Sequence, residues 1–190
     1  MEPRALLAAL TVAERLKDTT RHCYTSQGRH ESVAEHSWMM TLMAFFMQDE
    51  FPEADMDKVM RMCVLHDLGE CFTGDIPTFL KTNEQEKTEA VLLENWVDAL
   101  PETARTEMQD LYREMEARQT LEAKIYKAID GLEALIQHNF SDLSTWSENE
   151  FALNLTYAQD RVTFSKYLTQ LREEIRQDTV KKIQSSTHST

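Results

Sequence analysis

Apolar residues recur at spacings of three and four along most of this chain of 190 residues, which is the pattern of one face of an α-helix. In the first run the apolar positions include Leu6, Leu10 and Leu16. Residues 21–32 lose the periodicity and are expected to form a loop, and residues 141–151 a connecting loop or a short helix. The pattern predicts helices over about residues 5–17, 33–49, 56–71, 82–100, 102–117, 121–139 and 165–183.

Two of these helices begin with a capping signal. Ser32 stands three residues before Glu35, which is the spacing of a capping box. Thr82 and Gln85 repeat the same spacing. Between the third and fourth predicted helices, segment 73–78 holds both a glycine and a proline, so we expect a constrained backbone there.

Glycine and proline are scarce, with four of each in the whole chain. Average proteins contain roughly 12% of the two together, and β-sandwiches and barrels need them at their turns. The predicted fold class is therefore all-α. A chain of this length can bury about 70% of its unfolded surface as one domain. We expect a single-domain helical bundle over residues 1–184 and a disordered tail over 185–190.

The charge is strongly negative, with 20 Lys and Arg against 33 Asp and Glu, a net −13. This balance argues against a nucleic-acid duplex as partner, because such binding depends on clustered cations. The longest uncharged apolar run, residues 37–47, is shorter than the ~20 residues of a membrane span. The N-terminus lacks the pattern of a secretion signal. We therefore expect a cytoplasmic protein with no membrane partner.

Three cysteines, Cys23, Cys63 and Cys71, have no CxxC spacing. An odd number of cysteines without that spacing indicates neither a disulfide framework nor a zinc ribbon. We expect reduced and mostly buried thiols.

Histidine and carboxylate residues gather in one segment of the third predicted helix. In VLHDLGE, His66 stands four residues before Glu70, and Asp67 three before it, so all three share one side of a helix. The surrounding residues are apolar, and a buried charge needs a partner. A divalent cation can be that partner. A hydrogen-bonded pair without metal is the alternative, and Asp130, in an apolar phase of a later helix, can equally be an ordinary helix acid.

Four separated blocks resemble the HD-domain metal-dependent phosphohydrolases. They are VAEHSW with His36, LHDLGE with the pair His66 and Asp67, TGDIPT, and KAIDGLEALIQ with Asp130. More narrowly, the blocks look like the branch of bacterial 5′-deoxynucleotidases and relatives of HD-domain-containing protein 2. The resemblance covers about residues 16–139 and agrees with the all-α prediction.

The resemblance implies a metal centre and a catalytic carboxylate. Its four ligands would be His36, His66, Asp67 and Asp130, holding one divalent transition metal: Mn, Co, Fe, Ni or Zn. Glu70 matches the carboxylate that activates a metal-bound water in the family. A group that only orients a ligand is the alternative role for Glu70.

The resemblance also implies four substrate contacts, at Arg21, Asp75, Lys81 and Glu114. Asp75 can alternatively cap a turn, and Arg21 and Lys81 can be solvated surface charges. The family has a tryptophan near the position of Arg21, whereas this chain reads His22, Cys23 and Tyr24. Base and sugar selectivity therefore stay open, as does which of His22 and Tyr24 replaces the aromatic group.

These observations predict a phosphohydrolase that cleaves (deoxy)nucleoside 5′-monophosphates with a metal-activated water. An HD hydrolase of another phosphate ester or signalling nucleotide is the nearest alternative. A non-catalytic metal-binding dimeric scaffold is a second, and a helical bundle without a site is a third. The resemblance further implies a homodimer.

Overall fold

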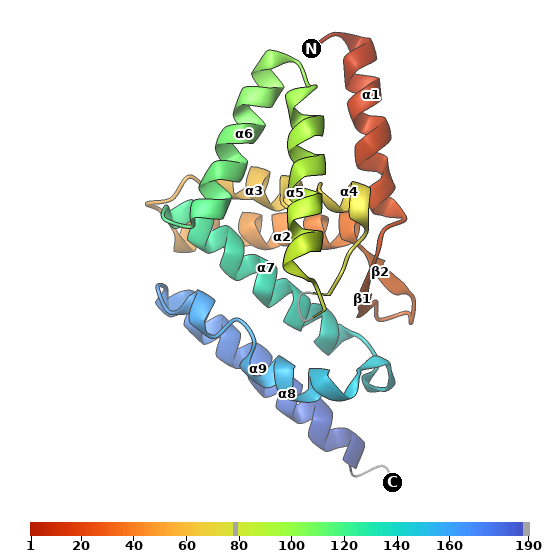
Figure 1. Cartoon of the computed structure of the whole chain (residues 1–190). Helices are drawn as coiled ribbons and strands as arrows, with labels where there is room; N and C mark the ends of the chain where they lie inside the picture. The colour runs from red at the N-terminus through yellow and green to blue at the C-terminus, as the bar shows by residue number, and fades with distance from the viewer. Residues whose placement is uncertain (78–79, 188–190) are drawn as a thin grey trace.

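The structure is a computed structural model that describes residues 1–77 and 80–187, and helices make up most of it (Figure 1). The α-helices are α1 (Pro3–Ala13), α2 (Val33–Phe46), α3 (Met56–Leu65), α4 (Glu70–Thr73), α5 (Asn83–Asp98), α6 (Glu102–Ala117), α7 (Leu121–Phe140), α8 (Glu148–Thr156) and α9 (Lys166–Thr187). Short 3₁₀ turns are η1 (Glu14–Lys17), η2 (Gln48–Glu50), η3 (Leu143–Thr145) and η4 (Asp160–Val162). The all-α prediction is confirmed.

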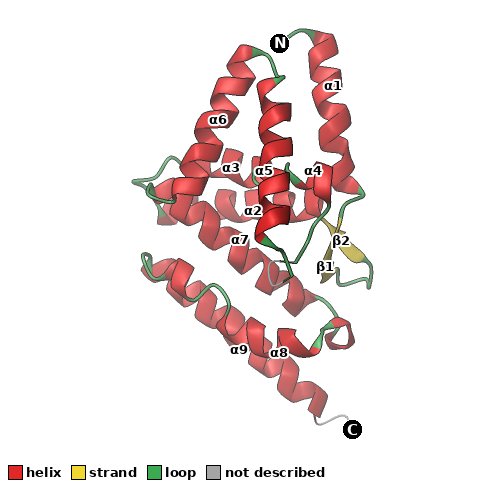
Figure 2. Ribbon diagram, in the orientation of Figure 1, coloured by secondary structure: helices red, strands yellow, loops and turns green. Residues whose placement is uncertain are grey.

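Helix α7 lies at the centre and packs against α2, α3, α6 and α9. Ile125, Ile129 and Leu132 follow one another at helical spacing and are fully buried. Met40 of α2 and Met62 of α3 complete this part of the core. Figure 2 shows α1, α5 and α6 on one side of α7 and α8 and α9 on the other. Helices α2, α3 and α7 therefore pack directly against one another.

Both predicted capping boxes are present. The hydroxyl of Ser32 accepts a hydrogen bond from the Glu35 backbone N–H, and the Glu35 carboxylate accepts one from the Ser32 backbone N–H. Thr82 and Gln85 make the same reciprocal pair at the start of α5. The predicted starts of α2 and α5 are confirmed.

The predicted helix over 56–71 is wrong in one respect, because it is interrupted at residues 66–69. Helix α3 ends at Leu65 and α4 begins at Glu70. Two hydrogen bonds at the break span three residues instead of the four of an α-helix. They run from Leu68 N to Leu65 O at 3.1 Å and from Glu70 N to Asp67 O at 3.0 Å. The interruption reorients the side chains that follow α3.

The predicted loop over 21–32 is also wrong, because its two ends pair as antiparallel strands. The strands are β1 (Thr20–Tyr24) and β2 (His30–Ser32), joined by a turn in which Gly28 has a φ of +80°. Strands this short and polar leave no alternation of apolar residues for sequence analysis to detect.

Three predictions concern the ends of described segments. Helix α9 continues through Thr187, past the predicted start of the tail at residue 185. Residues 188–190 of that tail lie outside the described residues, and so does Thr78, the last residue of the segment expected to be constrained.

Among the described residues, no helix combines the length and apolarity needed to cross a membrane.

Gly131 of α7 lies where η4 approaches the helix. A Cβ atom at this position would lie 2.7 Å from Ala158 Cβ and 3.2 Å from Arg161 Nη1. Real Cβ atoms essentially never come so close to another atom, so the contact requires glycine. The close approach brings Arg161 to α7, beside Asp130.

We predict that Gly131→Ala lowers the free energy of unfolding by about 1–3 kcal/mol, as overpacking does. The sign is diagnostic, since alanine inside a helix is otherwise about 1 kcal/mol better than glycine. Chemical denaturation measures the change. Adding Ala158→Gly removes the opposing methyl group and suits the φ of +61° there, so the double variant should regain stability. A single variant as stable as the wild type would contradict the close contact.

Candidate metal centre

The four predicted ligands meet, although they come from three separate parts of the chain. The ligand atoms of His36, His66 and Asp67 all lie within 4.8 Å of one another. His66 Nε2 is 2.8 Å from Asp67 Oδ2. Asp130 of α7 adds its Oδ1 at 3.4 Å from His36 Nε2 and 3.9 Å from His66 Nε2. The structure therefore brings together the four residues that the resemblance implied.

Each histidine directs the same ring atom at the cluster. His66 Nδ1 lies 2.9 Å from the Cys63 carbonyl oxygen, which can only accept, so Nδ1 carries the proton. His36 Nδ1 pairs in the same way with the Glu133 carboxylate. Both Nε2 atoms are buried and lie against carboxylate oxygens, His36 Nε2 against Asp130 and His66 Nε2 against Asp67. With both rings neutral, two imidazole nitrogen atoms and two carboxylates form a donor set that suits a divalent transition metal.

The charges of the cluster agree with a cation at its centre. Burial opposes ionisation of Asp67, yet His66 and His36 bring its pKa down to about 2. Burial also opposes ionisation of Asp130, yet Lys127 and the histidines hold its pKa well below the usual range. Burial and Arg21 lower the pKa of His36, but Glu133 and Asp130 raise it to about 10. A proton on His36 occupies the place that a metal ion can take.

Glu133 was missed by sequence analysis and is fully buried. It stands three residues after Asp130 on α7. The same helical face therefore carries the predicted ligand Asp130 and the carboxylate that pairs with His36, another predicted ligand. Glu31 of β2 lies beside it, and burial together with Glu133 raises the pKa of Glu31 to about 8. The i,i+3 spacing from Asp130 was the only available signal.

Glu70 begins α4, one turn after the histidine and aspartate pair, and is 7% exposed. Burial, then the carboxylates of Asp67 and Asp75, raises its pKa to about 9. Its Oε2 is buried without a hydrogen-bond partner. Glu70 and Asp67 line the same cavity, which has a volume of about 290 Å³. The carboxyl group of Glu70 therefore lies in the same cavity as a predicted metal ligand, Asp67.

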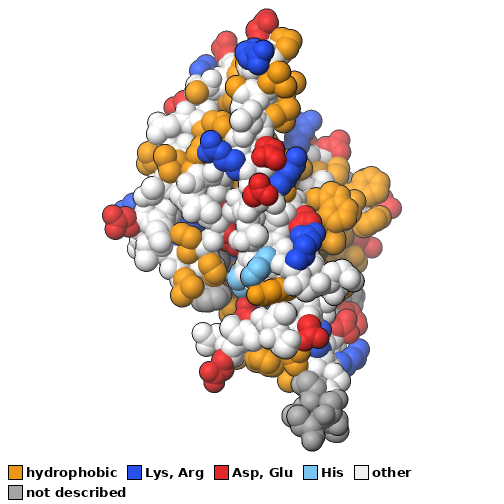
Figure 3. Space-filling model, turned by 90° about the vertical axis from the view of Figure 1, so that its right-hand side faces the viewer, with side chains coloured by type: hydrophobic (Ala, Val, Ile, Leu, Met, Phe, Trp, Pro, Cys, Tyr) orange, Lys and Arg blue, Asp and Glu red, His pale blue; other side chains and the backbone are white. Residues whose placement is uncertain are grey.

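The cavity is rich in cations although the chain is acidic. Arg21 is largely buried, with Nη1 at 3.8 Å from Asp67 Oδ2. Lys127 donates to Asp130 Oδ2 at 2.6 Å. The cationic side chains that line the cavity are Arg21, Lys81, Arg118, Lys127 and Arg161. Figure 3 shows basic and acidic side chains mixed around exposed histidine on one face. The same cavity is lined by as many carboxylates: Asp67, Glu70, Asp75, Glu86 and Asp130. The cations can therefore hold an anion only where these carboxylates are neutralised.

Three of these cations, Arg118, Lys127 and Arg161, were missed by sequence analysis. Lys127 precedes Asp130 by one helical turn, which is a detectable spacing. Arg161 reaches the site through the close contact at Gly131. Arg118 ends α6 and is itself left-handed, with φ of +52°. Sequence periodicity predicts neither of these two features.

The other predicted substrate contacts are placed unequally. Asp75 lines the cavity, after Gly74 with its φ of +77°. Lys81 lines it too, but it donates to Glu89 Oε2 at 2.8 Å. Glu114 does not line it, since its carboxylate accepts from Lys58 Nζ at 3.0 Å and from Thr120 Oγ1.

Of the residues that follow Arg21, His22 lines the cavity, whereas Tyr24 packs on His30 with ring centroids 4.1 Å apart. Of these two candidates for the family's aromatic group, only His22 therefore lines the cavity.

Glu133→Gln should weaken divalent metal binding about 10–100-fold, because the neutral amide no longer orients His36 or raises its basicity. Titration against a chromophoric chelator measures the affinity. Glu122→Gln is the matched control on the same helix, since Glu122 accepts from the Asp55 backbone N–H at 2.9 Å, away from the cluster. Equal affinities for Glu133→Gln and the wild type would contradict the orienting role.

Comparison with known proteins places this chain in a family. Residues 13–176 match the HD domain family. The chain is 31% identical over 138 residues to human (Homo sapiens) 5′-deoxynucleotidase HDDC2, covering 70% of this chain and 67% of that protein. The Xenopus laevis protein of the same name is 30% identical over 138 residues, with coverages of 70% and 68%. A crystal structure of a predicted metal-dependent phosphohydrolase from Magnetospirillum magnetotacticum MS-1 is similar with a TM-score of 0.77 and 25% identity, over 94% of this chain and 95% of that one. The chain belongs to the HD domain family.

Proposed function

We propose that this protein is a metal-dependent phosphohydrolase that releases phosphate from (deoxy)nucleoside 5′-monophosphates. The observation that carries the proposal is the pair of buried Nε2 atoms of His36 and His66, which face two carboxylates beside a cavity lined by both cationic and anionic side chains. The names of the human and Xenopus relatives, both 5′-deoxynucleotidases, support the choice of substrate.

The donor set suits Mn, Fe, Co, Ni or Zn, because imidazole and carboxylate accept all of these ions. When bound, such an ion supplies Lewis acidity and lowers the pKa of a coordinated water from 15.7 to about 7. His36, His66, Asp67 and Asp130 are the residues that would hold it.

Glu70 serves as the proton acceptor in this proposal. It lines the cavity with Asp67, and its buried Oε2 makes no hydrogen bond that would compete for a proton. Its pKa is raised to about 9 by burial and by neighbouring carboxylates, so it is protonated at neutral pH in the protein alone. Positive charge at the centre lowers the pKa of a nearby carboxyl group. The ionised, proton-accepting form of Glu70 thus depends on a filled centre.

Cations on the cavity wall bind the phosphate in this proposal. Arg21 and Arg161 present guanidinium groups, which can hold two phosphate oxygens at once. Lys127 adds a third charge next to Asp130. These cations offset the negative potential of the chain where a dianionic substrate enters.

Hydrolysis of a different phosphate ester is the alternative that one observation favours. The residue after Arg21 that lines the cavity is His22 rather than a tryptophan, so a base or sugar bound there would meet a polar ring. A non-catalytic scaffold agrees less well with Glu70, because a purely structural centre has no use for a buried carboxyl group beside its ligands.

We propose a cytoplasmic homodimer. Trp38, Phe45 and Phe46 on α2 are all more than a third exposed, and exposed aromatic side chains are common at the interfaces between protein chains. Sedimentation equilibrium measures the mass in solution.

We predict phosphate release from nucleoside 5′-monophosphates in the presence of Mn²⁺, Co²⁺ or Zn²⁺. A panel of ribo- and deoxyribonucleotides, with other phosphate esters and a signalling nucleotide, separates the main proposal from its alternative. A chelator should abolish the activity and metal should restore it. Activity that survives chelation, or its absence on every ester, would overturn the proposal.

Glu70→Gln should lower turnover about 10²–10⁴-fold, the contribution of a general base, and should keep its metal. Asp67→Ala should lose both activity and metal. Glu86→Gln is the matched control, because Glu86 is an exposed carboxylate at the edge of the same cavity. Steady-state kinetics and elemental analysis measure the two effects. Near wild-type turnover in Glu70→Gln would exclude the role as base.

A further inference from the structure

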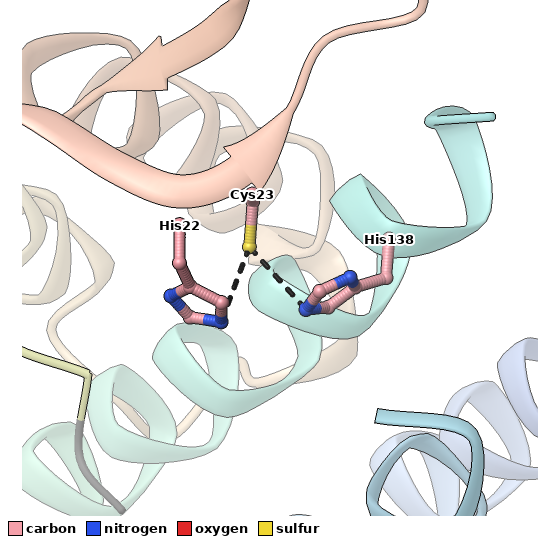
Figure 4. A group of neighbouring side chains, drawn as sticks. All are labelled: His22, Cys23 and His138. Carbon is pink, nitrogen blue, oxygen red and sulfur yellow. Dashed lines mark hydrogen bonds between the residues drawn. The ribbon is translucent and has the colours of Figure 1, made fainter. Parts of the chain in front are cut away.

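A second group of potential ligands lies outside the centre described above. His22 and Cys23 of β1 lie beside His138, in the last turn of α7 (Figure 4). Their ligand atoms all lie within 4.8 Å of one another, although 115 residues separate Cys23 from His138. Only the fold brings these side chains together, because nothing in the local sequence relates them.

Glu150 of α8 adds a fourth donor atom. Its Oε1 lies 3.4 Å from His22 Nε2 and 3.6 Å from His138 Nε2. Cys23 Sγ lies 3.8 Å from His22 Nε2 and 3.4 Å from His138 Nε2. One sulfur and two nitrogen atoms therefore lie together, and the carboxylate oxygen lies beside the two nitrogen atoms.

We propose that His22, Cys23, His138 and Glu150 bind a second divalent transition-metal ion, with Zn²⁺ as the preferred ion. A tetrahedral Zn²⁺ has bonds of about 2.3 Å to sulfur and about 2.0 Å to nitrogen and oxygen. These bonds set sulfur and nitrogen about 3.5 Å apart, and nitrogen and oxygen about 3.3 Å apart. The four contacts of 3.4–3.8 Å match four of the six edges of that tetrahedron to within a few tenths of an ångström. The edge between Cys23 Sγ and Glu150 Oε1 is longer than in a tetrahedron, so the carboxylate must turn toward the sulfur when the ion binds.

Hydrogen bonding alone explains the group less well. Hydrogen bonds between nitrogen and oxygen measure about 2.7–3.2 Å, which is shorter than both contacts of Glu150 Oε1. The Cys23 thiol can donate to one imidazole, but its sulfur is only a weak acceptor for the N–H of the other. A metal ion would bind the sulfur and both nitrogen atoms at once.

Neighbouring contacts hold these donors in place. Glu150 caps α8 through its other oxygen, Oε2, which accepts from the Ser147 backbone N–H at 2.5 Å. The ring of His138 packs edge-on against Trp146, whose Nε1 donates to the His138 carbonyl oxygen at 3.1 Å. Fixing donors before the ion arrives is what raises affinity in metal sites.

An irregular strand explains how two consecutive residues reach one point. Side chains alternate between the two faces of a regular strand. In β1, however, four residue steps from Thr20 to Tyr24 pair with only two steps from Ser32 to His30, so the register shifts. Such irregularities reorient side chains. His22 and Cys23 can therefore both lie near His138.

The ion can enter from the cavity. Cys23 is fully buried, but His22 and His138 line the same cavity as Asp67 and Glu70. The two centres share no residue, and only the second contains sulfur. An ion there would tie β1 to α7 and α8, and β1 also carries Arg21, which reaches Asp67.

The test uses Co²⁺ as a spectroscopic probe of the full-length chain. A thiolate bound to Co²⁺ absorbs in the near ultraviolet by charge transfer, whereas the histidine and aspartate ligands of the HD centre give no such band. We expect the wild type to bind one Co²⁺ at each centre and to show the band, and Zn²⁺ to displace it. Cys23→Ser should remove the band and one equivalent of metal.

Cys71→Ser is the matched control, because Cys71 is also a buried thiol and does not belong to the group. It should keep the band and the full metal content. Glu150→Gln retains a capping oxygen but removes the charge, so it should lower the affinity of the second ion about tenfold or more.

The wild-type spectrum decides the question even if Cys23→Ser does not fold. Saturation with one Co²⁺ per chain and no thiolate band would overturn the proposal, and so would a band that Cys71→Ser abolishes and Cys23→Ser leaves intact. Loss of the HD centre by Asp67→Ala should leave the band in place, so this result is independent of the proposed hydrolysis.

Discussion

The contact between α2 and α7 is built around two side chains that are completely buried, His36 and Glu133. A buried imidazole and a buried carboxylate are tolerated because they face each other, and an unpaired charge there would cost several kcal/mol. The pairing also fixes the ring of His36, so its Nε2 must point at Asp130. The position of the metal centre thus follows from how the core neutralises its own charges.

Much of the fold was predictable because its signals are local. The capping box at Ser32 fixes the start of α2, and with it the position of His36. The apolar spacing of α7 identified Asp130 as a charge on a buried face. The hairpin was not predictable, since a strand of five residues and one of three, mostly polar, bury too little for a periodic pattern.

The parts of the sites that escaped prediction depend on contacts between distant segments. Arg161 reaches Asp130 only because Gly131 lets η4 come close, and the sequence of η4 alone reveals nothing of this. His138 and Cys23 meet across 115 residues. The residues proposed as ligands of the HD centre were grouped because a resemblance supplied the long-range relation that local reasoning lacks. No resemblance related His22, Cys23, His138 and Glu150 to one another.

Net charge describes the whole chain and misleads about its cavity. A chain of charge −13 repels phosphate at a distance, yet Arg21, Lys127 and Arg161 line one cavity, where the proposed phosphate would lie. Arg21 and Lys127 are ion-paired to Asp67 and Asp130. Filling the centre with a divalent ion draws those carboxylates toward the ion and weakens their hold on the cations. Metal and phosphate should therefore bind cooperatively, because the same carboxylates that bind the one otherwise neutralise the groups that bind the other.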